Sequence, residues 1–503
     1  MLDTLLQHLP ALQVVLPLLA APIALLMGKQ TRLIWVFATL ISWVCFAIAI
    51  QLLMQVQTGD VIRYDFGGWP APWGIEYRID SLNAYILLIV SGIAAVIFPY
   101  AQKSIEKEIP PQHQSLFYVL MLLCLAGLLG MTITGDAFNV FVLLEISSLS
   151  TYALMSLGRD RRALTSAFQY LVMGTIGATF ILIGIGLLYI LTGSLNMLDL
   201  AEKIKGLHDS RTLQVAYGFL IVGFGLKLAM FPLHLWLPNA YAYAPSVVSA
   251  FLAATATKVA IYTMLRFMFT VFGADFSFQA MQVQWLFLPL ASIAVIVASV
   301  VAIFQSDLKH MLAYSSVAQI GYMLLGISLA NINGLTATLL HVFNHALMKG
   351  ALFLALGALC YQVGNTHISR LAGIGKQMPW TFIAIVLGGL SLIGVPLTVG
   401  FISKWYLILG SIERGWWPVV MIIIIGSLLA VIYIWRIVEA AYFKQDDTKT
   451  NSDTASSEIR EAPLSLLIPT WILVLANLGF GIYATFTADI SKSTAALLFG
   501  GIQ

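Results

Sequence analysis

The sequence has little charge. Only 10% of its 503 residues are charged, 60% are hydrophobic and the mean hydropathy is +0.90, whereas about a quarter of the residues in a soluble domain are charged. Such a chain has too little polar surface to cover its apolar residues in water. We therefore expect an integral membrane protein with many spans.

Basic patches and cysteine are also scarce, which excludes further classes of protein. The net charge is +3 and no cluster of basic residues stands out from the membrane segments, so nucleic-acid binding is excluded. Cys45, Cys124 and Cys360 lie far apart within apolar runs. This pattern excludes a disulfide scaffold and predicts small, buried hydrophobic side chains. No loop is long enough for a domain that binds a flavin, an iron–sulfur cluster or a nucleotide, so we expect no cofactor.

Fourteen apolar runs are long enough to cross a bilayer as helices, and polar or Pro/Gly breaks separate them. They cover residues 11–27, 33–56, 81–100, 115–133, 137–157, 163–192, 212–233, 245–273, 284–304, 310–330, 335–360, 379–412, 416–443 and 463–488. The first run lacks the basic start and cleavage site of a signal peptide. Continuous apolarity excludes the alternating strands of a barrel, so the predicted fold is an all-α polytopic bundle.

Two shorter segments and the basic residues complete the predicted topology. Residues 197–206 predict a short interfacial helix, and 444–462 predict a flexible solvated loop. Loops on one side carry thirteen Lys and Arg residues and those on the other side carry eight. Because cytoplasmic loops are the more basic, we expect both termini outside.

Ionisable side chains within the apolar runs carry most of the functional information. An ionised group near the bilayer centre costs about 2.5–3.5 kcal/mol on insertion scales, so such residues usually face a hydrated or paired interior. A single lysine near a helix end can instead extend to the interface. We name these the relay residues: Glu145, Lys227, Lys258, His341, His345, Lys349 and Lys404.

The signs of the relay residues do not balance. One glutamate faces four lysines, and several like charges in a low dielectric disfavour one another. Some of the lysines are therefore expected to be neutral or to switch charge, as a proton relay requires. Glu145 is the expected partner of Lys227, and the alternative for this couple is a static buried ion pair.

His341, His345 and Lys349 recur every four residues, so one helix face carries three titratable groups over about 12 Å. Protons can hop between such groups directly or through single waters. Two alternatives remain for the histidines. The HxxxH spacing suits zinc, although no third ligand is near in sequence and we expect no metal. The histidines can also simply brace the bundle.

Two spans contain helix-breaking residues beside their lysine. Pro232 follows Lys227 on the seventh span, and Pro396 and Gly400 precede Lys404 on the twelfth. Corresponding interrupted helices in two halves are typical of inverted repeats. We expect N-terminal helices 1–3 in residues 1–110, repeats of five helices in 111–275 and 276–445, and a cytoplasmic loop with the last helix in 446–503.

At this point the residues resemble a known family, the antiporter-like subunits of Mrp-type Na⁺/H⁺ antiporters, respiratory complex I and membrane-bound hydrogenases. The resemblance rests on runs 227–240 (KLAMFPLHLWLPNA), 305–316 (QSDLKHMLAYSS), 341–349 (HVFNHALMK) and 400–404 (GFISK). Within the family, 68–75 (GWPAPWGI) and 192–197 (TGSLNM) look most like the D-type subunit of Mrp antiporters. The match extends in order over nearly the whole chain.

The resemblance implies a fold and a set of roles. The fold is fourteen helices with two inverted five-helix units and discontinuous helices 7 and 12, in a bacterial cytoplasmic membrane and in complex with other membrane subunits. It implies a half-channel to each face, joined by the relay residues at mid-depth. Further residues of the matching runs are expected to support proton uptake: His234, Asp307, Lys309 and Ser315. Three positions depart from the pattern, because the family often has acidic residues at Asn239 and Tyr243 and a basic one at Gln169.

Three functional hypotheses follow. In the first, the chain is a transporter subunit rather than an enzyme, and it exchanges protons for Na⁺. In the second, the same channel belongs to a redox-driven pump of the complex I or hydrogenase type. In the third, the chain is a non-conducting scaffold. The sequence does not identify the coupled cation or its route.

Overall fold

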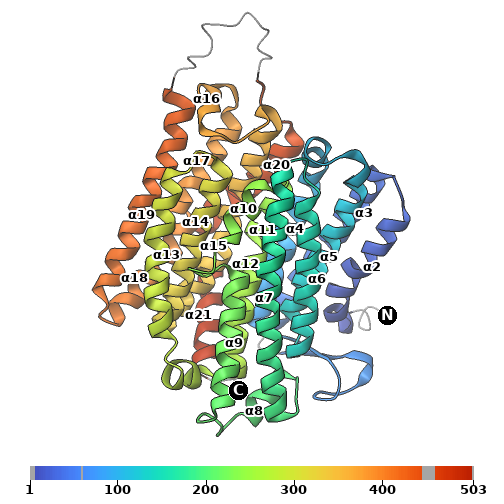
Figure 1. The fold of residues 1–503 in the computed structure, drawn as a ribbon, viewed down its shortest axis with the longest axis vertical. Helices are drawn as coiled ribbons and strands as arrows, with labels where there is room; N and C mark the ends of the chain where they lie inside the picture. The colour runs from blue at the N-terminus through green and yellow to red at the C-terminus, as the bar shows by residue number, and fades with distance from the viewer. Residues whose placement is uncertain (1–5, 58–60, 445–458, 501–503) are drawn as a thin grey trace, which may run out of the picture.

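The computed structural model describes residues 6–57, 61–444 and 459–500 as a bundle of long helices that run in roughly one direction (Figure 1). The first and the last described residues lie toward one end of the bundle, which we call the termini face (Figure 1). The opposite end, the loop face, holds the α4–α5, α6–α7, α13–α14 and α15–α16 links. Of the predicted loop 444–462, residues 445–458 lie outside the described residues.

Most of the predicted spans are single helices or continuous helical runs. In the described residues, twelve are long and apolar enough to cross a membrane. They are α2 (Leu9–Leu26), α3 (Thr31–Val56), α4 (Ser81–Glu108), η2 (Pro111–His113) with α5 (Gln114–Ile133), α6 (Ala137–Ser156), α7 (Arg161–Thr192), α11 (Ser246–Ala254) with α12 (Ala256–Leu265) and η3 (Arg266–Val271), α13 (Gln284–Phe304), α14 (Leu308–Ser328), α15 (Ile332–Val363), α19 (Trp417–Val438) with η6 (Glu439–Phe443), and α20 (Leu464–Ile482). These runs confirm the predicted all-α polytopic fold.

Two further crossings are made by pairs of shorter helices. The seventh consists of α9 (Arg211–Leu228) and α10 (Trp236–Tyr243), and Pro232 lies in the link between them. The twelfth consists of α17 (Pro379–Ile393) and α18 (Val399–Glu413), with Pro396 in the link. A Cβ at Gly400 would overlap the carbonyl oxygen of Ser391, so only glycine lets α18 begin this close to α17. Both predicted discontinuities are therefore present.

The helices that carry most of the relay residues form the centre of the bundle. The α11–η3 run and α14 are almost entirely buried, whereas less than half of the apolar windows of α3, α7, α13 and the α19–η6 run is buried. α15 packs against α4, α11, α14, α17, α18, α20 and α21. The first helices of the two five-helix units, α5 and α13, start at opposite faces, as inverted repeats require. The repeat boundaries themselves remain a prediction.

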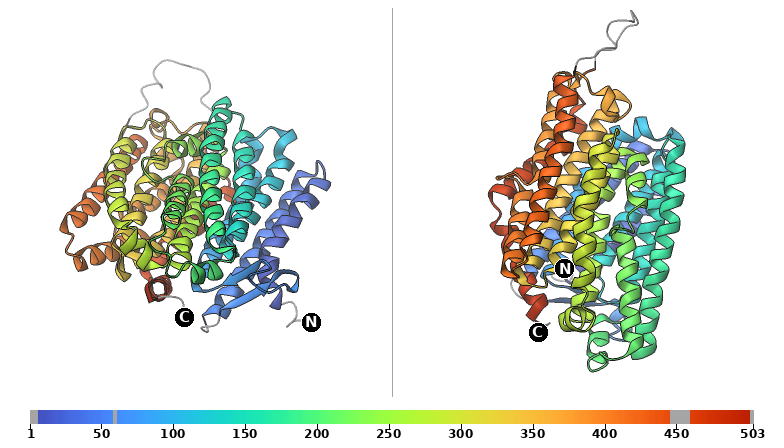
Figure 2. Two further views of the ribbon diagram at one scale, coloured as in Figure 1. Left: turned by 60° about the horizontal axis from the view of Figure 1, so that its bottom comes forward. Right: turned by 60° about the vertical axis from the view of Figure 1, so that its left-hand side comes forward.

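Some elements lie at the ends of the spans. The interfacial helix is confirmed as α8 (Met197–Lys203) on the termini face. The structure adds an antiparallel hairpin, β1 (Ile62–Asp65) and β2 (Glu76–Ile79), joined through η1 (Phe66–Gly68). It also adds η4 (Phe276–Ala280), η5 (Ile368–Arg370) and α16 (Ile374–Gln377). The predicted last helix, 463–488, was wrong at its end: α20 stops before Tyr483, and α21 (Thr485–Gly500) follows near the termini face (Figure 2).

Candidate proton-relay site

The ion pair on the first unit joins α6 and α9. Lys227 lies in the last turn of α9, immediately before the break, and its side chain is buried. The Lys227 ammonium nitrogen lies 3.7 Å from Glu145 Oε1 and donates a hydrogen bond of 2.9 Å to Ser148 Oγ. Ser148 is three residues after Glu145, so both acceptors come from one face of α6. The sequence predicted the carboxylate and not the hydroxyl.

Lys258 lies beside a further helix discontinuity, between α11 and α12. The backbone of Thr255 departs from helical geometry, with φ −124° and ψ −57°, and separates α11 from α12. The fully buried Lys258 ammonium donates to the freed carbonyl oxygen of Ala253 and lies 3.4 Å from Thr257 Oγ1. A broken turn therefore supplies the polar partners for this lysine. No carboxylate in the described residues lies within 4.0 Å of it.

The two histidines on α15 have different surroundings. His341 contacts Ser403 Oγ through Nδ1 at 2.8 Å and Gln319 Oε1 through Nε2 at 2.9 Å. Its two nitrogens are thus occupied by neighbouring side chains, which disfavours the zinc alternative. His345 is fully buried, and neither of its ring nitrogens has a partner among the described residues. The two rings stack with centroids 6.0 Å apart.

The other two lysines also lie in the interior. Lys349 donates to the carbonyl oxygen of Leu312 at 2.7 Å and to the hydroxyl of Ser315, both on α14. Lys404 donates to the carbonyl oxygens of Leu392 and Ile393 at 3.0 and 2.9 Å. All four relay lysines are less than a tenth exposed, so none of them extends to the membrane surface.

Electrostatic contacts connect the relay residues across helices. Lys404 interacts electrostatically with His341, and Lys258 interacts electrostatically with both histidines and with Lys349. His345 interacts in the same way with Lys349. The second-unit residues and Lys258 therefore form one coupled group. α12, which carries Lys258, packs against α9, which carries Lys227.

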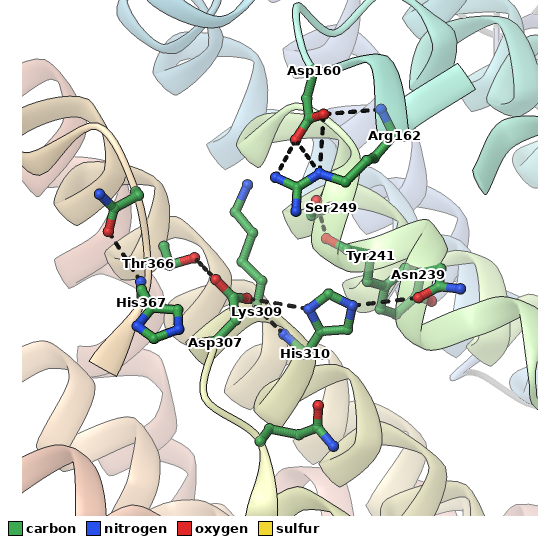
Figure 3. Close-up of polar contacts among 12 residues, drawn as sticks. Asp160, Arg162, Asn239, Tyr241, Ser249, Asp307, Lys309, His310, Thr366 and His367 are labelled. Atoms are coloured by element: carbon green, nitrogen blue, oxygen red, sulfur yellow. Dashed lines mark hydrogen bonds and ion pairs between the residues drawn. The ribbon is translucent and has the colours of Figure 1, made fainter. Parts of the chain in front are cut away.

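The predicted support residues fall into two places. Asp307 and Lys309, whose side chains are drawn in Figure 3, line a polar cavity of about 730 Å³ at the loop face. His234 lies deeper, in the α9–α10 link, where its Nδ1 has no partner in the described residues. Its ring faces the Tyr314 ring, with the two ring centroids 6.5 Å apart. Ser315, one residue further along α14, binds Lys349.

One residue at the cavity, Asp307, has a structural role as a helix cap. Asp307 is the N-cap of α14 and accepts hydrogen bonds from the His310 backbone at 3.1 Å and from Thr366 Oγ1 at 2.6 Å. Burial opposes its ionisation, but hydrogen bonds from His310 and Thr366 outweigh burial and lower the pKa of Asp307.

The predicted burial of Cys360 was wrong. It lies in the last turn of α15 and lines the cavity half-buried, because this turn reaches the loop face.

A buried ion pair near the termini face was not predicted from the sequence. Arg266 is one of the eight basic residues counted above in the loops of the less basic side. It is in fact buried and pairs with Asp80, the N-cap of α4. Arg266 also donates to the Tyr262 hydroxyl at 3.1 Å. Its position near the end of a long apolar run was the available signal, but nothing in the sequence indicated that a residue 186 positions away would face it.

Comparison with known proteins places the chain in a family. The profile of a family described as "NADH:quinone oxidoreductase/Mrp antiporter, TM" matches residues 134–430. NADH-quinone oxidoreductase subunit N of Desulforudis audaxviator is 42% identical, covering 95% of this chain and 96% of the relative. The D-type subunit of the Na(+)/H(+) antiporter of Bacillus subtilis is 29% identical, covering 97% and 96%.

A solved structure agrees with these relatives. A chain of the Mrp complex from Dietzia sp. superimposes with a TM-score of 0.89 and 25% identity, covering 99% of this chain and 98% of that chain. The family profile alone spans more than half of the sequence, and the relatives extend along nearly all of it. The chain is therefore a multi-pass integral membrane protein that belongs to the antiporter-like family shared by NADH:quinone oxidoreductases and Mrp antiporters.

Proposed function

We propose that the chain is the proton-translocating subunit of a multi-subunit membrane complex, and that the relay residues pass protons across it. The observation that carries this proposal is the burial of four lysines against one glutamate, with every lysine held by polar groups inside the bundle. A static core has no use for so many like charges, because each costs desolvation energy. A relay needs them, because each can be neutral in one state and charged in the next.

The Glu145–Lys227 pair is the element that changes state. Two opposite charges about 4 Å apart attract by about 4 kcal/mol at an effective dielectric of about 20. Lys258 lies on α12, which packs against α9, and a proton taken up by Lys258 disfavours the charge on Lys227. Lys227 then releases its proton, and its attraction to Glu145 is lost until it is protonated again. The two groups titrate together as a coupled system.

The energy source is the finer part of the proposal. Exchange with Na⁺ in an Mrp-type complex is the function that the motifs at 68–75 and 192–197 favoured, and the antiporter relative from Bacillus subtilis supports it. The alternative, a pump subunit driven by electron transfer in partner proteins, is supported by the relative that is 42% identical. In both cases the partners are other membrane subunits, and the relay residues have the same role.

Proton uptake by everted membrane vesicles tests both forms. Vesicles containing the tagged native complex should acidify or alkalise in response to Na⁺, to an electron donor such as NADH, or to both, which identifies the energy source. Glu145→Ala and Lys227→Ala should each abolish that response without loss of co-purifying subunits. The control is an exposed ion pair of the same composition on the termini face, tested as Glu202→Ala and Lys205→Ala. Full activity in the Glu145 and Lys227 variants would leave the scaffold hypothesis.

The orientation in the membrane is a further proposal. We place the chain in a bacterial cytoplasmic membrane with the basic loop face inside and both termini outside. Cys360 lines the cavity on the loop face, whereas Cys45 and Cys124 are buried. A membrane-impermeant maleimide should therefore label Cys360 in everted vesicles and not in intact cells. Labelling only in intact cells would reverse the orientation.

A further inference from the structure

The cavity on the loop face is where segments far apart in sequence meet. Five of them line it: the end of α4, the α6–α7 loop, the α10–α11 link, the start of α14 and the α15–α16 link. It lies above the second half of the broken seventh helix, and its volume of about 730 Å³ is large enough for many waters. His310, in the first turn of α14, points from the cavity wall toward α10 (Figure 3).

His310 lies between two oxygen acceptors. Its Nδ1 is 3.5 Å from Asp307 Oδ1, and its Nε2 is 3.4 Å from Asn239 Oδ1. The Asn239 amide also donates through Nδ2 to Gln169 Oε1 at 3.3 Å. A neutral imidazole has one N–H and can donate to one of the two oxygens at a time, whereas an imidazolium can donate to both. His310 can therefore hold a proton toward either Asp307 or Asn239.

Two basic groups of the cavity are already paired with carboxylates. Arg162 forms hydrogen bonds with Asp160 and lies over the Tyr243 ring, 4.7 Å from its centroid. Lys309 on α14 faces Glu108 on α4 at 4.0 Å and donates to the carbonyl oxygen of Ala244.

The remaining titratable groups lie further round the wall. Lys107, Arg159 and His367 line the cavity elsewhere, and the Tyr243 ring packs edge-on against His310 with centroids 5.0 Å apart. This leaves Asp307 as the carboxylate that balances a charge on His310.

The three positions that depart from the family pattern all converge on this histidine. Asn239 bonds to it, Gln169 orients Asn239, and the Tyr243 ring packs against it. At these positions the family often has charged residues that can bind or attract a proton, and this chain has neutral ones. His310 is the titratable side chain that stands among them.

A route inward starts from the same helix. His310 and Tyr314 are four residues apart and lie on the same face of α14. Tyr314 faces His234 in the α9–α10 link, and the next residue, Ser315, accepts a hydrogen bond from Lys349. His310 thus stands at the outer end of a polar path whose inner end is a relay lysine.

We propose that His310 is the residue that collects protons from the loop-face cavity and passes them to the relay. The inference rests on the proposed proton-translocating function and adds a site and a route to it. It predicts that the rate of proton uptake from this face, and its dependence on pH, change when His310 is replaced.

The test compares His310→Gln with His367→Gln in vesicles containing the complete complex. The two histidines line the same cavity, but His367 is exposed and bonds to Ser369, so its replacement controls for loss of a histidine there. His310→Gln should lower the initial rate of proton uptake about tenfold and alter its dependence on pH, because a positioned proton-transfer group is lost. His367→Gln should leave both unchanged.

A second variant distinguishes lost proton collection from damage to the fold. In His310→Gln/Asn239→Asp, a carboxylate again lines the path, and the rate should recover with its pH dependence moved toward acid. If His310→Gln retains the native rate and pH profile while Lys227→Ala is inactive, the role of His310 is wrong and the relay stands. Failure of the added Asn239→Asp substitution to restore an impaired His310 variant would also overturn the role of His310. Native activity of Lys227→Ala would refute the relay itself.

Discussion

The lysines at the two helix breaks, Lys227 and Lys404, have different partners. Lys227 faces a carboxylate, Glu145, at 3.7 Å and a hydroxyl at 2.9 Å. Lys404 has neutral partners: the carbonyl oxygens of Leu392 and Ile393, Ser427 Oγ at 2.9 Å, and the Tyr322 ring 4.9 Å away. In the described residues no carboxylate lies within 4.0 Å of the Lys404 ammonium.

The difference follows from where each lysine lies relative to its break. Lys227 lies in the last turn of the first half-helix, and its counter-charge comes from Glu145 on α6. Lys404 lies on the second half-helix and reaches back to the last carbonyls of α17, the negative end of that helix dipole. A carboxylate can change its charge or distance, whereas backbone carbonyls cannot titrate. We infer that the partner of Lys227 can change its charge, whereas the partners of Lys404 exert a constant electrostatic field.

Replacing each lysine with arginine should have the largest effect and should remove the difference between the sites. Arginine keeps the positive charge and its contacts but does not release a proton at physiological pH. Lys227→Arg and Lys404→Arg should therefore both lower proton transport to the background level while the complex assembles. Lys205→Arg, at an exposed position, is the control. Native transport rates in either variant would show that its lysine serves only as a fixed charge.

Removing one acceptor from each lysine should make the difference visible. Glu145→Gln removes the counter-charge of Lys227, and we expect the transport rate to fall about tenfold. Ser427→Ala removes one of three oxygen acceptors of Lys404, a loss of about 1 kcal/mol that leaves both carbonyls in place. Its rate should fall by about twofold. Initial rates of proton uptake in the same vesicles measure both, and equal losses would contradict the distinction between a titratable and a fixed partner.

The sequence predicted those features of the fold and the site that depend on local composition. The boundaries of the spans followed from apolar runs, and the breaks at helices 7 and 12 followed from Pro232, Pro396 and Gly400. The pairing of Glu145 with Lys227 was predictable because Glu145 is the one acidic relay residue and lies deep within its apolar run, where it must face a base. In each case a residue within the run carries the physical signal.

Contacts between distant helices could not be predicted in this way. Lys258 depends on the carbonyl of Ala253, freed at Thr255, and His341 on Gln319 and Ser403. Neutral side chains and backbone carbonyls give no signal in an apolar run, because each is compatible with lipid-facing or internal positions. The hairpin β1–β2 was missed for another reason: its strands are four residues each, too short for a periodicity to be recognised.

An exposed ion pair gives the smallest expected effect and completes the comparison. Asp160 and Arg162 lie 2.8 Å apart on the loop face, and their side chains are 39% and 69% exposed, against 25% and 6% for Glu145 and Lys227. The hydrogen bond from Arg162 lowers the pKa of Asp160. This stabilisation is present above the ordinary pKa of about 3.9 and is lost as the pH falls through the lowered value in the folded protein.

Asp160→Asn therefore tests whether burial, rather than pairing, makes Glu145 important. Asparagine still caps α7, as Asp160 does through the Arg162 backbone N–H at 2.9 Å. Solvent screens the exposed pair, so the variant should lose less than about 1 kcal/mol of unfolding free energy at pH 7. That loss should be unchanged down to about pH 4 and should shrink below it, as Asp160 becomes protonated, and transport should change less than about twofold. Thermal unfolding of the purified complex at about pH 7, 4 and 3, with vesicle rates, measures both. A loss as large as that of Glu145→Gln would mean that the loop-face pair takes part in transport, and that burial does not separate the two pairs.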